Sequence, residues 1–252
     1  MRPAARARPG RASSSCHHKT MLGILTLDTA FPRIPGDVGC PETFGFPVRY
    51  ATVSGATPEE IVHRGSDALL PRFIRAADEL VEAGCTGIAT TCGFLARWQR
   101  ELAAELSVPV LTSTLLLVPL VARMLPAHRK VGVVTYSAIA LTPGLLESAG
   151  APPYTPAAGV DPLGYFSRTV RHGSDRLDSA RMSADVVDAA RHLVAQHQDL
   201  GAIVLECANM PPYRDAVVAA TELPVFDAAQ LLTWFHGGIA GSARRHARHN
   251  LW

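Results

Sequence analysis

The sequence predicts an α/β fold of two pseudo-symmetric lobes, each a mostly parallel sheet flanked by helices, with the active site in the cleft between the lobes. Two observations lead to this fold class. Short, continuously apolar runs alternate with segments of helical periodicity, which is typical of parallel strands buried on both faces. In addition, the two halves of the chain carry similar motifs in the same order. The 252 residues, 48% of them hydrophobic, suffice for two such units.

Six strands are expected from apolar runs bounded by polar or turn-forming residues. They lie at 22–27, 87–91, 109–112, 131–135, 202–206 and 224–226. Three helices are expected where apolar residues recur every three or four positions. They lie at 58–82, 92–106 and 183–197. Thr57 and Ser183 are the expected caps of the first and third helices, and Pro58 suits the first helical position.

An internal repeat relates the two halves of the chain. The stretch "GIATTCGF" at 87–94 resembles "AIVLECAN" at 202–209. Cys92 and Cys207 each lie 17 residues before the proline that begins the next expected strand. The shared spacing predicts that both cysteines stand at the same strand-to-helix joint of two similar units.

The repeat also sets the expected domain boundaries. Further upstream, "LGILTLDT" at 22–29 resembles "VGVVTYSA" at 131–138. We expect a first lobe at 21–127 and a second lobe with a C-terminal helix at 128–252. Residues 1–20 are expected to be a disordered extension or the product of an upstream start, with an organelle transit peptide as the alternative.

Charge and apolar content exclude several classes of protein. Residues 1–20 hold five basic residues and no acid, and the remainder has 19 basic residues (24 less these five) against 22 acidic ones. This mildly acidic balance favours no nucleic-acid partner. The longest apolar stretch, 111–125, is too short to cross a bilayer and contains Pro119 and Arg123. We therefore expect a soluble, cytoplasmic protein with no membrane partner.

Cysteine and lysine usage argues against metals and cofactors. Five cysteines, an odd number, do not indicate a disulfide framework, and no CxxC or HExxH pattern occurs. Lys19 and Lys130 are the only lysines of the chain, and neither is expected near the cleft, so a pyridoxal phosphate Schiff base is not predicted. We expect no cofactor.

Cys92 and Cys207 are the candidate catalytic residues. Ligands of parallel α/β sheets bind beyond the carboxyl ends of the strands, where both thiols are expected. The start of a helix favours a thiolate, and a modest shift would make both protonation states accessible near neutrality. Two thiols on opposite sides of one carbon suit inversion: one removes the α-proton and the other delivers a proton to the opposite face. A redox disulfide between them is the main chemical alternative.

A cysteine in an apolar context is more often a small core residue than a functional one. Cys85 precedes its strand, on the edge of the sheet away from the cleft, and is interpreted in that way. Cys40 lies in a loop that could reach the cleft, and we treat it as a bystander. The matched positions of Cys92 and Cys207 set these two apart.

With these motifs, the chain resembles the aspartate/glutamate/hydantoin racemase superfamily over about residues 22–240. The resemblance rests on "LTLDT", "TTCGF" and "LECANM", the last being closer to hydantoin racemases than to glutamate racemases. It implies two α/β lobes with one catalytic cysteine each and no cofactor. It also implies that Asp28 and Thr29 line the site, that Thr91 lies beside the first cysteine, and that Cys92 and Cys207 are the acid/base pair.

The sequence departs from the pattern of that superfamily after each cysteine. Gly93 and Phe94 replace the Asn-Thr of glutamate racemases, and Ala208 and Asn209 replace their Thr-His. Side-chain ligands are therefore partly missing, and the backbone N–H groups of these four residues would bind the substrate carboxylate. Decarboxylase relatives tend to keep only the second cysteine, so the presence of both argues against decarboxylation.

Other candidate substrate contacts come from the loop at 31–50 and from later strand ends. The loop is rich in Pro and Gly, and Arg33 within it could bind a carboxylate; an ordinary surface loop is an equally good interpretation. Thr135 ends the fourth expected strand and Ser137 follows it, and both are weaker candidates.

We expect a cofactor-independent racemase or epimerase, an isomerase of amino-acid metabolism, acting on an amino acid or a related small carboxylate. A hydantoin racemase or a maleate-type cis–trans isomerase of the same superfamily is the alternative among enzymes. A non-catalytic carboxylate-binding protein is the alternative from another class. A homodimer is left open.

Overall fold

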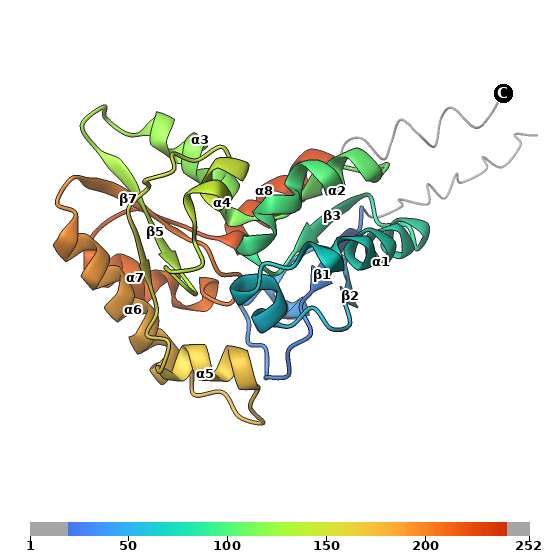
Figure 1. Cartoon of the computed structure of the whole chain (residues 1–252), viewed down its shortest axis with the longest axis horizontal. Coiled ribbons are helices and arrows are strands. Elements are labelled where there is room, and N and C mark those ends of the chain that lie inside the picture. Colours follow the sequence, from blue (N-terminus) through green and yellow to red (C-terminus); the bar gives the residue numbers. More distant parts are fainter. Residues whose placement is uncertain (1–19, 241–252) are drawn as a thin grey trace, which may run out of the picture.

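The computed structural model describes residues 20–240 and contains two sheets of four parallel strands each (Figure 1). The first sheet comprises β1 (Leu22–Thr26), β2 (Val48–Thr52), β3 (Gly87–Thr90) and β4 (Val110–Leu111), in the order β2-β1-β3-β4. The second comprises β5 (Lys130–Thr135), β6 (Ala157–Gly159), β7 (Leu200–Leu205) and β8 (Val225–Phe226), in the order β6-β5-β7-β8. The identical strand order confirms the predicted α/β fold of two pseudo-symmetric lobes.

Two strands were not predicted, and both lie at a sheet edge. β2 has the sequence VRYAT and is half-exposed along its length, so it lacks the apolar run that marks a central strand. β6 is only three residues long, with the sequence AAG, and offers no β-branched side chain. The six predicted strands are present, although β4 and β8 are reduced to two residues each.

Helices connect the strands and cover both faces of the sheets. They are α1 (Leu70–Glu82), α2 (Gln99–Glu105), α3 (Leu117–Met124), α4 (Pro143–Ser148), α5 (Tyr165–His172), α6 (Ser179–Gln196), α7 (Arg214–Thr221) and α8 (Ala228–Ile239). Short 3-10 turns lie at Pro41–Thr43, Asp67–Leu69, Gly93–Trp98, Thr114–Leu116 and Pro211–Tyr213, and a π-helical turn lies at Glu59–His63.

The predicted helix at 58–82 is interrupted. The Thr57 hydroxyl does accept the Glu60 N–H at 3.3 Å, but the turn that it caps ends at His63. Gly65 then takes a positive φ of 58°, which breaks the helical path before α1 begins. The prediction failed because apolar periodicity continued across the glycine.

The other two predicted helices need smaller corrections. Segment 92–106 forms a 3-10 turn, Gly93–Trp98, followed by α2. The predicted helix at 183–197 begins earlier, as α6, and its cap is Asp178, whose carboxylate accepts the Arg181 N–H at 3.1 Å. Ser183 therefore lies inside the helix and does not cap it.

The last helix of each half packs on the sheet of the other half. α3 follows the first sheet in sequence but contacts β5 and β7 of the second. α8 follows the second sheet but contacts β3, and its Leu231 and Leu232 share a buried cluster with Ile24 of β1. In Figure 1, α3 lies over β7, while α8 lies beside α2 and β3. The C-terminal helix that the sequence assigned to the 128–252 lobe thus completes the core of the first lobe.

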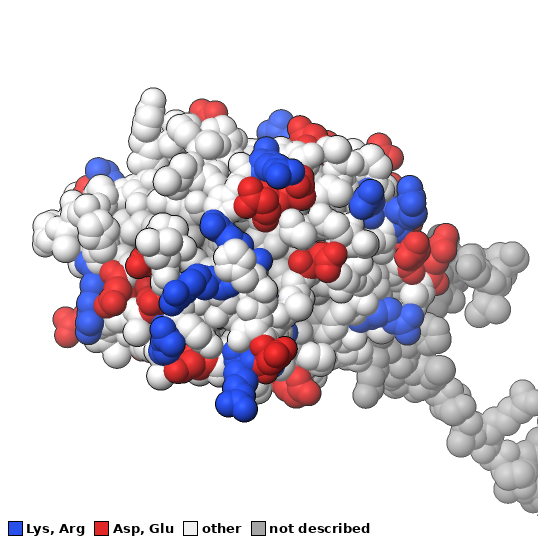
Figure 2. Space-filling view, turned by 60° about the horizontal axis from the view of Figure 1, so that its bottom comes forward, with Lys and Arg blue, Asp and Glu red and all other residues white. Residues whose placement is uncertain are grey.

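The surface mixes charges of both signs. On the face shown in Figure 2, Lys and Arg side chains are interspersed with Asp and Glu. Within residues 20–240, no helix has the length and apolar character needed to cross a membrane. The expectation for residues 1–20 falls, apart from Thr20, outside the described residues.

Candidate active site

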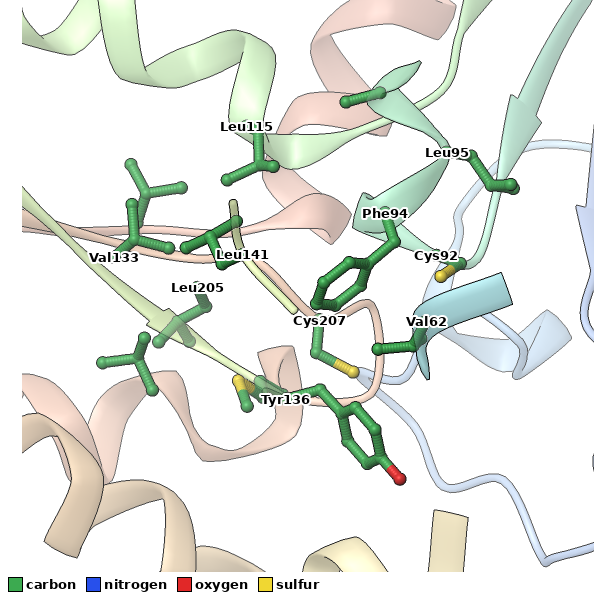
Figure 3. Packing of buried hydrophobic residues seen from close by; sticks show 14 of the residues in the cluster. Val62, Cys92, Phe94, Leu95, Leu115, Val133, Tyr136, Leu141, Leu205 and Cys207 are labelled. Carbon is green, nitrogen blue, oxygen red and sulfur yellow. The ribbon is translucent and has the colours of Figure 1, made fainter. Parts of the chain in front are cut away.

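Both predicted thiols line one small cavity between the lobes. Cys92 follows β3 and Cys207 follows β7, so each occupies the same place in its lobe. The cavity has a volume of about 30 Å³, enough for little more than a water molecule. Its walls are Leu27, Pro58, Val62, Thr91, Cys92, Phe94, Tyr136, Val170, Glu206, Cys207 and Asn209. In Figure 3, Val62, Phe94 and Tyr136 surround the two sulfur atoms.

Burial, not the helix start, dominates the protonation of Cys92. Loss of water and the nearby Glu206 carboxylate raise the pKa of Cys92 to about 12. The backbone N–H groups of Phe94 and Leu95 and the charge of Arg97 lower that pKa, but by less. The sequence predicted only a modest shift. In this closed cavity the thiol is protonated at neutral pH.

Cys207 is held by a chain of polar contacts that begins in the loop after β1. Its thiol donates to Asn209 Oδ1 at 3.5 Å, and Asn209 Nδ2 donates to Asp37 Oδ2 at 3.1 Å. Asp37 is buried, and its carboxylate forms an ion pair with Arg33 at 3.2 Å. Burial and the charge of Glu206 raise the pKa of Cys207 well above its usual value. This thiol too is neutral in the closed cavity.

Glu206 is the site residue that the sequence reasoning missed. It is 1% exposed, and its carboxylate accepts the Thr135 hydroxyl at 2.8 Å and the Tyr136 N–H at 3.2 Å. The backbone N–H of Gly93 in the other lobe donates to the same carboxyl group. Burial raises the pKa of Glu206 to about 7 against these three hydrogen bonds. The sequence did contain a signal for this residue: an acidic residue stands directly after an apolar strand, at the position that Thr91 occupies in the other copy of the repeat.

Gly93 allows the two lobes to meet at this point. A Cβ on residue 93 would lie 2.7 Å from the backbone carbonyl oxygen of Glu206 and closer still to its carboxylate. Only glycine leaves room for that approach. Its N–H is directed at Glu206, so in this structure it is not free for the substrate carboxylate that the sequence assigned to it.

The structure brings some predicted site residues to the cavity and leaves others away from it. Thr91, Phe94 and Asn209 line it together with the two cysteines. Thr135 is not part of the cavity wall, but its hydroxyl donates to the Glu206 carboxylate, which is. The carbonyl of Ala208 accepts the Val38 N–H at 3.1 Å, which ties the loop after β1 to the second lobe.

The residues predicted from the end of the first strand have other partners. Asp28 is exposed, and its carboxylate accepts the Gly55 N–H at 2.9 Å, so it stabilises a loop and does not line the site as predicted. Arg33 is engaged by Asp37 and donates to the Thr29 hydroxyl at 2.8 Å. None of Asp28, Thr29 and Arg33 lines the cavity.

The two remaining described cysteines lie outside the cavity lining. Cys40 donates to a Glu42 carboxylate oxygen at 3.0 Å, and Cys85 is buried in the core. Among the described residues, no group of three or more His, Cys, Asp and Glu is arranged to hold a metal ion.

A second, larger cavity adjoins the first. It has a volume of about 180 Å³, and Tyr136 belongs to the walls of both cavities. Ser137, another predicted site residue, lines this outer cavity with His63, Ser167 and Arg171. Within residues 20–240, the buried hydroxyls of Tyr136 and Ser167 form no hydrogen bond of good geometry, although Arg171 interacts with the Tyr136 hydroxyl and partly offsets the rise in its pKa that burial causes. Arg171 Nη2 lies 2.8 Å from His63 Nε2.

Comparisons with known proteins support this fold and add a relative in sequence. A dimethylsulfoniopropionate lyase of Durusdinium sp. clade D is 31% identical over 246 residues, which cover 94% of this chain and 80% of that protein. No protein-family profile matches the chain.

Solved structures share the two-lobed fold at low sequence identity. Arylmalonate decarboxylase matches with a TM-score of 0.57 at 16% identity, covering 88% of this chain and 92% of the other. A glutamate racemase of Bacillus anthracis matches with a TM-score of 0.54 at 13% identity, covering 93% and 84%. These structures confirm the predicted fold, while the sequence relative is a lyase and not a racemase.

Proposed function

Because this chain belongs to the dimethylsulfoniopropionate lyase family, we propose that it is a lyase that cleaves dimethylsulfoniopropionate or a closely related sulfonium-bearing carboxylate by elimination. The observation that carries the proposal is the meeting of Cys92 and Cys207 at one water-poor cavity between the lobes. A thiolate there is a base placed to remove a proton next to a carboxylate.

The proposed reaction balances with one cysteine as the base. A thiolate takes a proton from the carbon next to the carboxylate, and the C–H electron pair becomes the carbon–carbon double bond. The bond between the β-carbon and sulfur breaks, and its electron pair leaves with the sulfur as dimethyl sulfide. Acrylate is the other product. The protonated thiol then returns its proton to solvent.

The outer cavity is the proposed route for the substrate. The thiol cavity of about 30 Å³ is too small for the substrate, and the outer cavity of about 180 Å³ is not. Tyr136 separates the two, so a rotation of its side chain would join them. Arg171 at the outer cavity supplies a positive charge that suits a carboxylate.

Racemisation is the second candidate, favoured by the pseudo-symmetric origin of the two thiols. Both reactions begin with removal of an α-proton. A substrate with a good leaving group on the β-carbon then eliminates, whereas one without it is reprotonated. The outcome therefore depends on the leaving group that the substrate carries.

The test is product formation by the full chain with single-cysteine controls. Incubation with dimethylsulfoniopropionate should release dimethyl sulfide, measured by headspace gas chromatography, and equimolar acrylate, measured by NMR. Of Cys92→Ser and Cys207→Ser, the variant that removes the base should lower the rate by at least about a hundredfold, the usual contribution of a positioned acid or base. Cys85→Ser is the matched control and should keep the wild-type rate.

The same samples in heavy water identify the base. The variant that lacks the base should neither eliminate nor exchange the α-proton of a non-eliminating carboxylate. A chiral assay with aspartate, glutamate and hydantoins tests racemisation in parallel. Folded wild-type protein that releases no dimethyl sulfide would refute the lyase proposal, and inversion of an amino acid would replace it with the racemase.

A further inference from the structure

Glu206 is a buried acid that faces the thiol cavity without a cationic partner. Among the described residues, no Lys, Arg or His nitrogen lies within ion-pair distance of its carboxylate, although seven other contacts of that kind are present. Its three hydrogen bonds come from neutral donors, namely the Thr135 hydroxyl and the backbone N–H groups of Tyr136 and Gly93. A buried carboxylate is normally paired with a positive charge, and Glu206 lacks that partner.

The carboxylate is held rigidly in place. Donors from β5 and from the segment after it fix one oxygen, and Gly93 of the opposite lobe reaches the same group. Because glycine at position 93 is needed for that approach, the local backbone is fitted to this acid. Glu206 therefore cannot swing out to solvent to find a counter-ion, and a cation must come to it.

The rest of the cavity lining suits a cation that forms no hydrogen bonds. Phe94 and Tyr136 present aromatic rings to the same cavity, and Leu27, Val62 and Val170 supply apolar surface. No basic residue is part of this lining. Aromatic rings together with a carboxylate are the groups that recognise sulfonium and quaternary ammonium ions, which carry positive charge but no N–H donor.

On this basis, and building on the lyase proposed above, we propose that Glu206 is the counter-ion for the cationic end of the substrate. The site would thereby select small zwitterions with a sulfonium or quaternary ammonium group over neutral compounds of the same shape. At the other end, the substrate carboxylate extends towards Tyr136 and the Arg171 side of the site.

A bound cation would also help the thiols. The negative charge of Glu206 raises the pKa of both Cys92 and Cys207. A positive charge beside Glu206 offsets that repulsion, so binding of the correct substrate favours formation of the thiolate base. A neutral compound of equal shape would leave both thiols protonated.

The experiment compares two unreactive probes of similar shape by calorimetry. One is 3-(trimethylammonio)propionate, and the other is 4,4-dimethylpentanoate, in which carbon replaces the cationic nitrogen. Wild-type protein should bind the cationic probe at least about tenfold more tightly, the effect expected of one desolvated charge contact. Glu206→Gln should lose this preference while its affinity for the neutral probe stays within about twofold.

Two controls keep the result interpretable. Glu79→Gln makes the same carboxylate-to-amide change on the exposed side of α1, away from the cavity lining, so it should keep the preference. If Glu206→Gln does not fold, Glu206→Asp keeps the charge but withdraws it from the cavity, and its preference should fall below that of the wild type. Equal affinity of the wild type for both probes, or a preference retained in folded Glu206→Gln, would overturn the proposal. Binding is measured without turnover, so a protein that prefers the cation but releases no dimethyl sulfide would refute only the lyase reaction.

Discussion

Gly93→Ala should destabilise the protein at the seam between the lobes. The new methyl group would lie 2.7 Å from the backbone carbonyl oxygen of Glu206, well inside van der Waals contact. A flexible side chain could move away, but this oxygen follows directly on the buried strand β7. The two lobes must therefore separate slightly at the cavity, and the hydrogen bond from the Gly93 N–H to the Glu206 carboxyl group must lengthen.

The expected loss follows from those two effects. Insertion of a methyl group into a packed interior costs about 1–3 kcal/mol. A hydrogen bond to a charged group contributes about 1.5–3 kcal/mol, part of which is lost. Together they predict a decrease of about 3 kcal/mol in the free energy of unfolding. For a chain of this size, that corresponds to a melting temperature lower by about 6–12 °C.

Urea unfolding followed by circular dichroism measures this loss. The matched control is Gly144→Ala in α4, where a Cβ would have no neighbour within 4 Å. That substitution should be neutral or stabilise the protein by up to about 1 kcal/mol, since it restricts the unfolded chain. Equal urea midpoints for Gly93→Ala and the wild type would show that the Gly93–Glu206 approach is not tight, and the account of the seam would be wrong.

Three further predictions concern buried polar groups. The pKa of Glu206 is about 7 in the folded state against a usual 4.5, so the folded state keeps a proton that the unfolded state loses. The stability that this proton contributes is complete below about pH 4.5, and about 3 kcal/mol of it is lost as the pH rises through 7. Urea midpoints of Glu206→Gln should therefore depend less on pH than those of the wild type. Asp37→Asn leaves Arg33 without its charged partner but also removes a carboxylate whose pKa is raised by burial, so it should cost about 1–3 kcal/mol. Formation of dimethyl sulfide should slow because Asn209 no longer orients Cys207, and unchanged urea midpoints would contradict this. Tyr136→Phe removes a buried hydroxyl that forms no hydrogen bond of good geometry within residues 20–240 and has only a weak contact with Arg171, so its melting temperature should stay within a few degrees of the wild type, and a larger fall would contradict this.

The sequence was sufficient for the lobes and the thiols because both depend on repeated patterns. Apolar strands and the matched positions of Cys92 and Cys207 occur twice at equal spacing, so each copy supports the interpretation of the other. The edge strands β2 and β6 were missed because a strand with one partner need not be apolar. Features that occur in only one half of the chain had no second copy to support their interpretation.

The finer site could not be predicted because it depends on contacts between distant segments. Glu206 gains its position from Gly93, which lies in the other lobe. Arg33 appeared free to bind a carboxylate, but Asp37, four residues later in the same loop, holds it. The thiols were expected near neutrality, and burial, which depends on the whole cavity, raises their pKa values. Spacing along the chain shows which strand ends meet, and not which polar groups pair there.

The exchange of α3 and α8 between the lobes makes the two halves of the chain mutually dependent. Each half lacks one of the helices that cover its own sheet, so a fragment ending near residue 127 would leave Ile24 and its apolar neighbours exposed to water. Separate fragments should therefore be poorly folded alone and should complement each other when mixed. A chain with duplicated architecture thus folds as one cooperative unit, and the cavity at its centre exists only when both halves are complete.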